Sequence, residues 1–147
     1  PERIFENPQK EKTRAFINRI RSLSRRIGSP DYDLYALNAE IETFCEKQIL
    51  SRKTRHNLLL LVEELLQIYA PHLPTAPLEL TLAYSEKKES LELICESFGD
   101  ALNPLDKDLL PDELGLAIIR NLAESIEYRR EDDRNRLTLR MKKGSSG

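Results

Sequence analysis

The sequence predicts an α+β protein, and three stretches carry that prediction. Residues 57–70, NLLLLVEELLQIYA, place leucines on nearly every side, which is typical of a helix buried on more than one face. Residues 78–95 alternate apolar and polar side chains on both sides of the charged tip EKKE, which predicts a β-hairpin. Residues 126–141 repeat this alternation around the polar turn REDDRN and predict a second hairpin.

A further helix is predicted before the central one, at Asp33–Lys47. Asp31 or Asp33 can cap its start, and Ser51 can cap the central helix. Pro71 ends the central helix, because the residue before a proline is disfavoured in the helical conformation. The apolar side chains of the first helix recur at helical spacing, at Leu34, Leu37, Ile41, Phe44 and Cys45.

Three further segments complete the predicted domain. Residues 19–29 alternate weakly, and they fit either a continued N-terminal helix or an edge strand. Residues 97–112 hold one glycine and two prolines, which predicts a long loop, and a loop of this length is more often functional or mobile than inert. Glu113–Leu122 is predicted as a short helix. Its expected inward side chains are Leu114, Ala117, Ile118 and Leu122.

Composition excludes several classes of function. The 147 residues suit one domain, and the net charge of −2 gives no general reason to expect nucleic acid as a partner. Only residues 19–26 are locally basic, and such a short cluster is usually a solvated face. Cys45 and Cys95 are too few for a disulfide framework and are expected as buried thiols. Without a signal peptide or a membrane-length apolar run, the expected location is cytoplasmic, with no direct membrane insertion.

The N-terminal segment contains Ile4-Phe5, Asn7-Pro8, Thr13 and Phe16-Ile17 in that order. This order resembles the segment that closes the ATP-binding subunit of polar amino-acid ABC transporters. The resemblance implies an ATPase domain before Pro1, because the chain itself has no GxxxxGK[ST] phosphate-binding loop. A plain helix that starts at Asn7-Pro8 is the alternative. The predicted organisation is a leader at 1–28, a domain at 29–143, and a flexible end or cloning remnant at 144–147.

The central helix carries Glu64, with Ile68 and His72 following at intervals of four residues. Together with the order of helices and hairpins, this resembles the GHKL or histidine-kinase-like ATPases, nearest to the anti-sigma-factor serine kinases. The resemblance implies a two-layer sandwich, with a mostly antiparallel sheet covered on one face by helices. In that family a Glu helps to position water and an Asn four residues later holds magnesium. Glu64 matches the Glu and His72 matches a common His, but Ile68 replaces the Asn.

Two further nucleotide-binding boxes are matched only in part. Ser97-Phe98-Gly99 stands where the family has Asp-x-Gly, so the adenine-binding Asp is replaced by Ser97. Of the glycine-rich phosphate turn only Gly115 remains, and the acidic side chains of Asp112 and Glu113 disfavour phosphates there. The closing pattern of the family is matched by Tyr128-Arg129, Asn135, Leu137 and Leu139. The resemblance therefore implies a degenerate nucleotide pocket, formed by Glu64, Ile68, His72, Ser97, Gly99 and Gly115, in which ATP and magnesium are disfavoured.

Each reactive side chain has a simpler, structural interpretation beside the functional one. Glu64 is a weak candidate for a catalytic base, and the alternatives are a polar-edge residue or a partner of Arg120. His56 and His72 have no thiol or carboxylate at metal-ligand spacing, so no metal site is predicted. Ser97 and Ser125 lack a paired base in the sequence, and the acidic residues of the long loop lack the EF-hand spacing.

Three functional hypotheses follow. The first is a non-catalytic accessory or regulatory domain of an amino-acid ABC transporter ATP-binding protein, which contacts transporter subunits or a second copy of the chain, or senses a ligand. The full-length protein would be an ATPase peripheral to the inner face of the membrane. The second is an ATP-binding anti-sigma-type serine kinase. The third is a plain interaction module that presents the exposed side of residues 33–47 to a partner helix.

Overall fold

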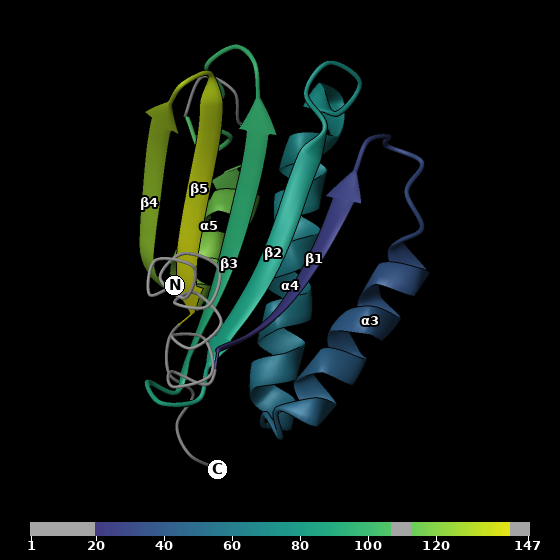
Figure 1. The fold of residues 1–147 in the computed structure, drawn as a ribbon, viewed down its shortest axis with the longest axis vertical. Helices are drawn as coiled ribbons and strands as arrows, with labels where there is room; N and C mark the ends of the chain where they lie inside the picture. The colour runs from purple at the N-terminus through teal and green to yellow at the C-terminus, as the bar shows by residue number, and fades with distance from the viewer. Residues whose placement is uncertain (1–19, 107–112, 142–147) are drawn as a thin grey trace, which may run out of the picture.

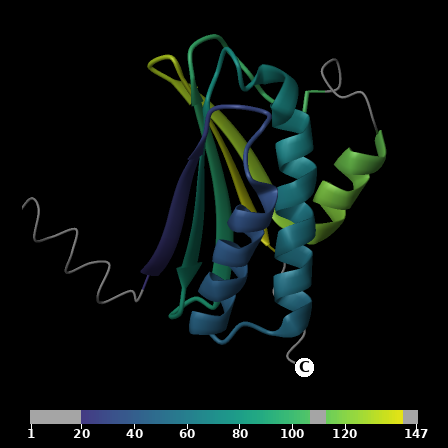
Figure 2. The ribbon, with the colours of Figure 1, turned by 90° about the vertical axis from the view of Figure 1, so that its right-hand side faces the viewer.

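The computed structural model describes residues 20–106 and 113–141. Within these ranges, five strands form one antiparallel sheet in the order β1-β2-β3-β5-β4. The strands are β1 (Ile20–Ile27), β2 (Leu78–Ser85), β3 (Ser90–Phe98), β4 (Ala123–Glu131) and β5 (Arg134–Met141). The helices are α3 (Leu34–Lys47), α4 (Arg52–Tyr69), the 3-10 helix η1 (Ala70–His72) and α5 (Glu113–Leu122). All of them lie on one face of the sheet (Figures 1 and 2), which confirms the predicted two-layer α+β class.

Both predicted helix starts are confirmed. The Asp33 side chain accepts a hydrogen bond from the Ala36 N–H at 3.0 Å and caps α3. The Ser51 side chain accepts one from the Thr54 N–H at 3.1 Å and caps α4. These oxygens satisfy backbone donors that have no partner inside the helix.

The core lies between α4 and the inner face of the sheet. Six side chains of α4 are fully buried, and their spacing of three and four residues places them on one face of the helix: Leu58, Leu61, Val62, Leu65, Leu66 and Tyr69. The fully buried surface is thus narrower than the leucine-rich sequence predicts, because Leu59 and Ile68 at its borders are only half-buried. Alternate residues of the strands meet them, namely Leu78, Leu80, Leu82, Leu91, Leu93, Cys95, Leu137, Leu139 and Met141. Each fully buried leucine contributes about 1.5–3 kcal/mol by removal from water, so this layer is the main source of stability.

The structure decides between the two predictions for residues 19–29 in favour of the edge strand. β1 pairs antiparallel with β2 from Ile20↔Ser85 to Ile27↔Leu78. The sheet therefore includes residues that precede the predicted domain start at residue 29. The leader residues 1–19, residues 107–112 of the long loop, and residues 142–147 lie outside the described ranges.

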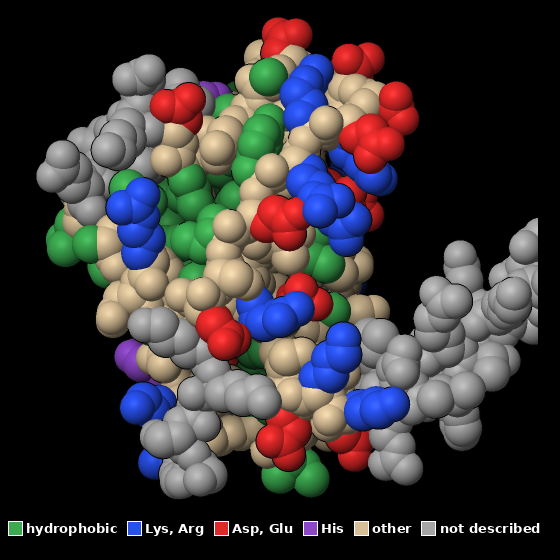
Figure 3. All heavy atoms as spheres, turned by 90° about the vertical axis from the view of Figure 1, so that its left-hand side faces the viewer, with side chains coloured by type: hydrophobic (Ala, Val, Ile, Leu, Met, Phe, Trp, Pro, Cys, Tyr) green, Lys and Arg blue, Asp and Glu red, His purple; other side chains and the backbone are tan. Residues whose placement is uncertain are grey.

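The outer face of the sheet is polar and carries oppositely charged neighbours on adjacent strands. Glu92 of β3 lies opposite Arg140 of β5, and their charged groups are 3.8 Å apart. Glu96 forms a second pair with Arg134 at 3.4 Å. Figure 3 shows charged side chains of both signs side by side on the molecule, while hydrophobic side chains gather toward the helical layer. Exposed pairs of this kind contribute at most about 1 kcal/mol each. They keep this face polar more than they stabilise it.

The predicted inward face of α5 is wrong at Leu114, which is 66% exposed, and at Ala117, which is also exposed. The other two predicted residues, Ile118 and Leu122, are half-buried, and Leu122 packs against the core. Leu116 and Ile119 are buried. The helix is apolar on two overlapping sets of positions with helical spacing, and the sequence does not distinguish them. Where α5 packs against α4, Gly115 and Leu116 face inward and Leu114 faces solvent. No helix within the described ranges is long and apolar enough to cross a membrane.

The link between α3 and α4 contains a strained residue and provides a stability prediction. Ile49 has a φ of 55°, a conformation that a β-branched residue adopts only at a cost, and its side chain is 91% exposed. Glycine is preferred at this position after a helix. We expect Ile49→Gly to raise the free energy of unfolding by about 1 kcal/mol. Urea unfolding measures this change. Ile49→Ala, which retains a Cβ, is the control, and its free energy of unfolding should rise less. An equal rise would mean that the effect comes from removal of the exposed side chain and not from relief of the backbone strain.

Candidate functional site

The predicted pocket begins where α4 contacts α5. Glu64 is half-buried, and its Oε2 atom lies 3.2 Å from the position that a Cβ on Gly115 would occupy. Gly115 is buried in the first turn of α5, where backbone N–H groups lack partners within the helix and favour negative charge. The structure thus brings two of the six predicted pocket residues together. Arg120 is exposed, and no ion pair joins it to Glu64 in the described part of the chain.

Ile68 and His72 continue from Glu64 toward the end of the helix. Ile68 is half-buried and packs against the core, so a hydrocarbon side chain stands where the GHKL resemblance implies an amide. Magnesium takes oxygen ligands, which isoleucine cannot provide. His72 is half-buried in η1, and its carbonyl oxygen accepts hydrogen bonds from the backbone N–H groups of Thr75 and Ala76 at 3.2 and 2.8 Å. Among the residues that the structure describes, no three His, Cys, Asp or Glu side chains cluster as metal ligands would.

The end of α4 docks on β3 through Tyr69. The Tyr69 hydroxyl donates a hydrogen bond to Cys95, two residues before Ser97 on the same face of the strand. Burial raises the pKa of the Tyr69 hydroxyl far above its usual value and raises the pKa of the Cys95 thiol to about 12. Burial also raises the pKa of Cys45 to about 11. Both thiols are buried and protonated at neutral pH, so neither is an activated nucleophile.

Ser97 is buried, and a structural network engages its hydroxyl. The Asn135 side-chain amide donates hydrogen bonds to the Asp100 carbonyl oxygen at 2.8 Å and to Ser97 Oγ at 3.4 Å. Its Oδ1 atom accepts one from the Leu102 backbone N–H at 2.9 Å. Asn135 therefore fastens the loop after β3 to β5. Ser97 faces this amide, in a position that the resemblance assigns to adenine recognition.

Two further side chains donate hydrogen bonds to the same oxygen atom, Asn135 Oδ1. The Tyr128 hydroxyl donates to Asn135 Oδ1 at 2.6 Å, and Arg130 Nη1 donates to it at 3.0 Å. Gly99 adopts a φ of +115°, which favours glycine, and its N–H donates to the Asp133 carbonyl at 2.8 Å. The predicted pocket residue Gly99 is thus a turn residue, and it joins the β3 end to the β4–β5 turn.

Sequence reasoning noted Asn135 only as part of a family pattern and missed its role as the centre of this network. A signal was present in the alternation of β5. Asn135 falls on the same face as Leu137, Leu139 and Met141, so an inward-facing amide could be expected from its position. A buried amide requires hydrogen-bond partners, and the adjacent long loop supplies them.

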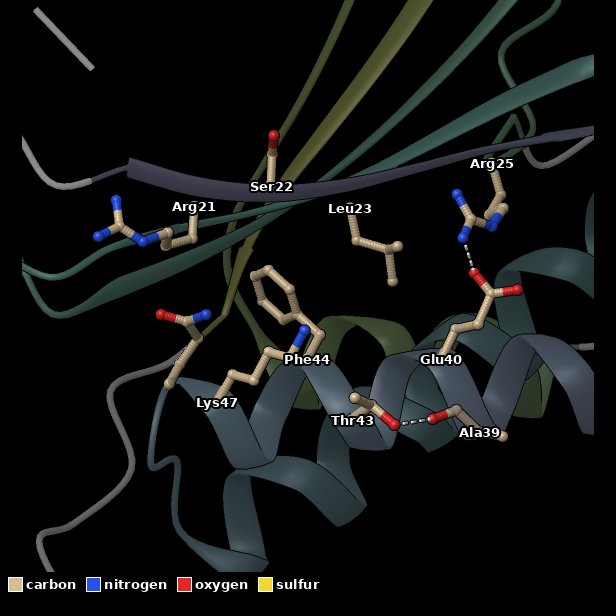
Figure 4. A pocket seen from close by; sticks show the side chains of 10 residues that line it. Arg21, Ser22, Leu23, Arg25, Ala39, Glu40, Thr43, Phe44 and Lys47 are labelled. Carbon is tan, nitrogen blue, oxygen red and sulfur yellow. Dashed lines mark hydrogen bonds and ion pairs between the residues drawn. The ribbon is translucent and has the colours of Figure 1, made fainter. Parts of the chain in front are cut away.

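A cavity lies away from this region, between β1 and α3. It has a volume of about 480 Å³ and is lined from the strand by residues that include Arg21 and Leu23, and from the helix by residues that include Phe44 and Lys47. Figure 4 shows that Leu23 points from the strand toward α3 and Phe44. The sequence does not predict this groove, because residues 19–29 fit either a helix or an edge strand. Phe44 was expected only as a core residue, which it also is.

No family model and no curated protein matches this sequence. Among solved structures, the fold is similar to that of a chain in the SiaB-SiaC complex from Pseudomonas aeruginosa, with a TM-score of 0.58. The two sequences are 12% identical, and the similarity covers 92% of this chain and 97% of that chain. At this identity the comparison establishes a shared fold over nearly the whole length of both chains.

Proposed function

We propose that this chain is a non-catalytic regulatory domain that acts through contacts with other proteins. The observation that carries the proposal is the position of Ile68, whose half-buried hydrocarbon side chain packs against the core. In the GHKL resemblance, an amide at this position holds the magnesium that bridges the phosphates. Glu64, by contrast, matches a residue that the nucleotide-binding members of that family also have.

The chemistry of magnesium and the position of Ser97 support a pocket that does not hold nucleotide. Magnesium takes oxygen ligands, and isoleucine provides none. Ser97, which replaces the adenine-binding Asp in the resemblance, faces the amide of Asn135. The loss of each polar interaction with the ligand costs about 1–3 kcal/mol. Since each 1.4 kcal/mol changes affinity about tenfold, the losses together weaken ATP binding by several orders of magnitude.

A role in protein contacts is supported by the structural neighbour. That chain was solved within a complex of two proteins, SiaB and SiaC, and it shares this fold along 97% of its length. The polar outer sheet face and the groove beside β1 are surfaces of this domain that the core does not use. A domain of this kind can regulate a partner if it binds two states of that partner with different affinity.

The finer proposal concerns the partner. Residues 1–17 resemble the end of an amino-acid ABC transporter ATP-binding subunit, and they lie outside the described residues. We propose transporter subunits, or a second copy of the chain, as partners, at the inner face of the membrane. Deletion of residues 20–143 from the full-length protein should then alter transporter assembly or the regulation of uptake. Unchanged assembly, uptake and regulation would count against this partner.

A calorimetric titration with ATP and magnesium tests the absence of nucleotide binding. We expect no saturable heat at nucleotide concentrations up to the millimolar range, because the lost interactions move the dissociation constant beyond it. The serine-kinase alternative requires micromolar affinity that depends on magnesium. The control is the same titration without magnesium, on protein whose folding has been checked by circular dichroism. Saturable, magnesium-dependent binding would overturn the non-catalytic proposal and favour the kinase.

A further inference from the structure

The groove between β1 and α3 combines three features that suit an extended peptide. The first is the free edge of β1. This strand pairs with β2 on one side, and no other described strand pairs with it on the second side. An edge strand presents a row of backbone N–H and C=O groups that an incoming strand can pair with.

The second feature is an apolar floor directly beside that edge. Leu23 of β1 and Phe44 of α3 face each other across the groove (Figure 4). Phe44 is buried, with 8% of its surface exposed, whereas Leu23 is half-buried and accessible from the groove. In a strand added to β1, alternate side chains point to the same face. One apolar side chain of such a strand can therefore cover Leu23 and Phe44.

The third feature is an excess of positive charge around this floor. Arg25 pairs with Glu40 at one end of the groove, which leaves that end neutral. Arg21 and Lys47 line the other end, and neither forms an ion pair with any residue that the structure describes. Both are exposed, so their charges are available to a ligand. An occupant with carboxylates matches this end.

This charge distribution distinguishes between possible occupants. A second copy of the chain would place its own β1, IRSLSRRI, against this edge, with three arginines in each strand and no acidic residue. Like charges on directly opposed strands are destabilising. An acidic strand instead gains a favourable partner for each arginine or lysine that it approaches.

We propose that the groove between β1 and α3 binds an extended acidic segment of a partner protein, which adds to the free edge of β1. An apolar side chain of that segment covers Leu23 and Phe44, and a carboxylate two residues away, on the same face of the strand, pairs with Arg21 and Lys47. This proposal rests on the proposed function, a domain that acts through protein contacts. It specifies the surface and the chemistry of the partner.

The test is a selection from a random octapeptide library, matched to the eight residues of β1, on the wild-type chain. The library is counter-selected on the double variant Arg21→Glu/Lys47→Glu. We expect enrichment of peptides in which an apolar residue and an acidic residue stand two positions apart, because these two side chains then point to the same face of the strand. Absence of enrichment, or enrichment of peptides without acidic residues, would overturn the proposal.

The selected peptide is then measured by fluorescence anisotropy. Binding to Arg21→Glu/Lys47→Glu should be weaker by about tenfold or more, as expected for the loss of close charge pairs. The matched control is Arg52→Glu/Lys53→Glu, with the same change in net charge at exposed positions of α4 that do not line the groove. It should bind the peptide within about twofold of wild type. Equal weakening in both variants would show a general charge effect and remove the site.

Backbone pairing has its own measurement. On peptide binding, amide hydrogen exchange should slow within β1 and not within β4, the strand at the opposite edge of the sheet. N-methylation of alternate peptide amides should abolish binding. Protection elsewhere, or binding unaffected by N-methylation, would overturn strand addition. If these peptide tests fail and the ATP titration shows no binding, the groove is rejected as a peptide-binding site and the proposed function stands. Saturable ATP binding removes the proposed function whatever the peptides do.

Discussion

Replacement of Leu65 by alanine is expected to lower the free energy of unfolding by about 3–4 kcal/mol. Leu65 has no exposed surface and lies in the middle of α4, the helix around which the core is built. Truncation removes buried methyl groups and leaves a cavity, because the helix and the sheet relax only in part. Urea unfolding followed by circular dichroism measures the change through the transition midpoint.

Gln67→Ala is the matched control for this prediction. Gln67 lies two residues further on the same helix and is exposed, so its replacement should change stability by about 0.5 kcal/mol or less. Similar losses for both variants would mean that α4 does not pack as the structure shows it. They would also undermine the positions of Glu64 and Ile68 on that helix.

The second large effect is expected for Asn135→Ala, which should lose about 3 kcal/mol. The side chain is 3% exposed and is the partner of the Leu102 N–H and the Asp100 carbonyl. Without the amide, both backbone groups lose their hydrogen bonds in a region largely shielded from water. Amide exchange at Leu102 should also accelerate, because the loop after β3 is no longer fastened to β5. Urea unfolding and hydrogen exchange measure the two effects.

Arg130→Ala provides the comparison. Arg130 donates to the same Asn135 oxygen, but it is an exposed residue and its other partner, Asp133, is exposed as well. Its removal should cost less than about 1 kcal/mol. If the two variants lost equal stability, the inward-facing contacts of Asn135 would not be the stabilising ones.

The pair Glu63-Glu64 shows where local reasoning succeeds and where it ends. Because an ionised carboxylate is costly to bury, two adjacent carboxylates on a leucine-rich helix must either line a pocket or form a polar edge in contact with water. In the structure Glu63 is exposed, whereas Glu64 is half-buried against Gly115. One turn of helix thus contains both outcomes. The deciding neighbour, α5, is almost fifty residues away in sequence, so no local pattern could have identified the contact.

The sequence by itself determined the helices α3 and α4 with their caps, the two hairpins, and the inward alternation of β2, β3 and β5. These features depend on backbone geometry and on side-chain periods of 3.6 and 2 residues, which local sequence records. Only the tertiary structure decided that residues 20–27 form an edge strand, which face of α5 is buried, which groups Asn135 joins, and that a basic groove lies beside β1. Each of these depends on contacts between segments far apart in the chain. Such contacts depend on how the layers pack, because an apolar or polar side chain can satisfy its local pattern in more than one arrangement.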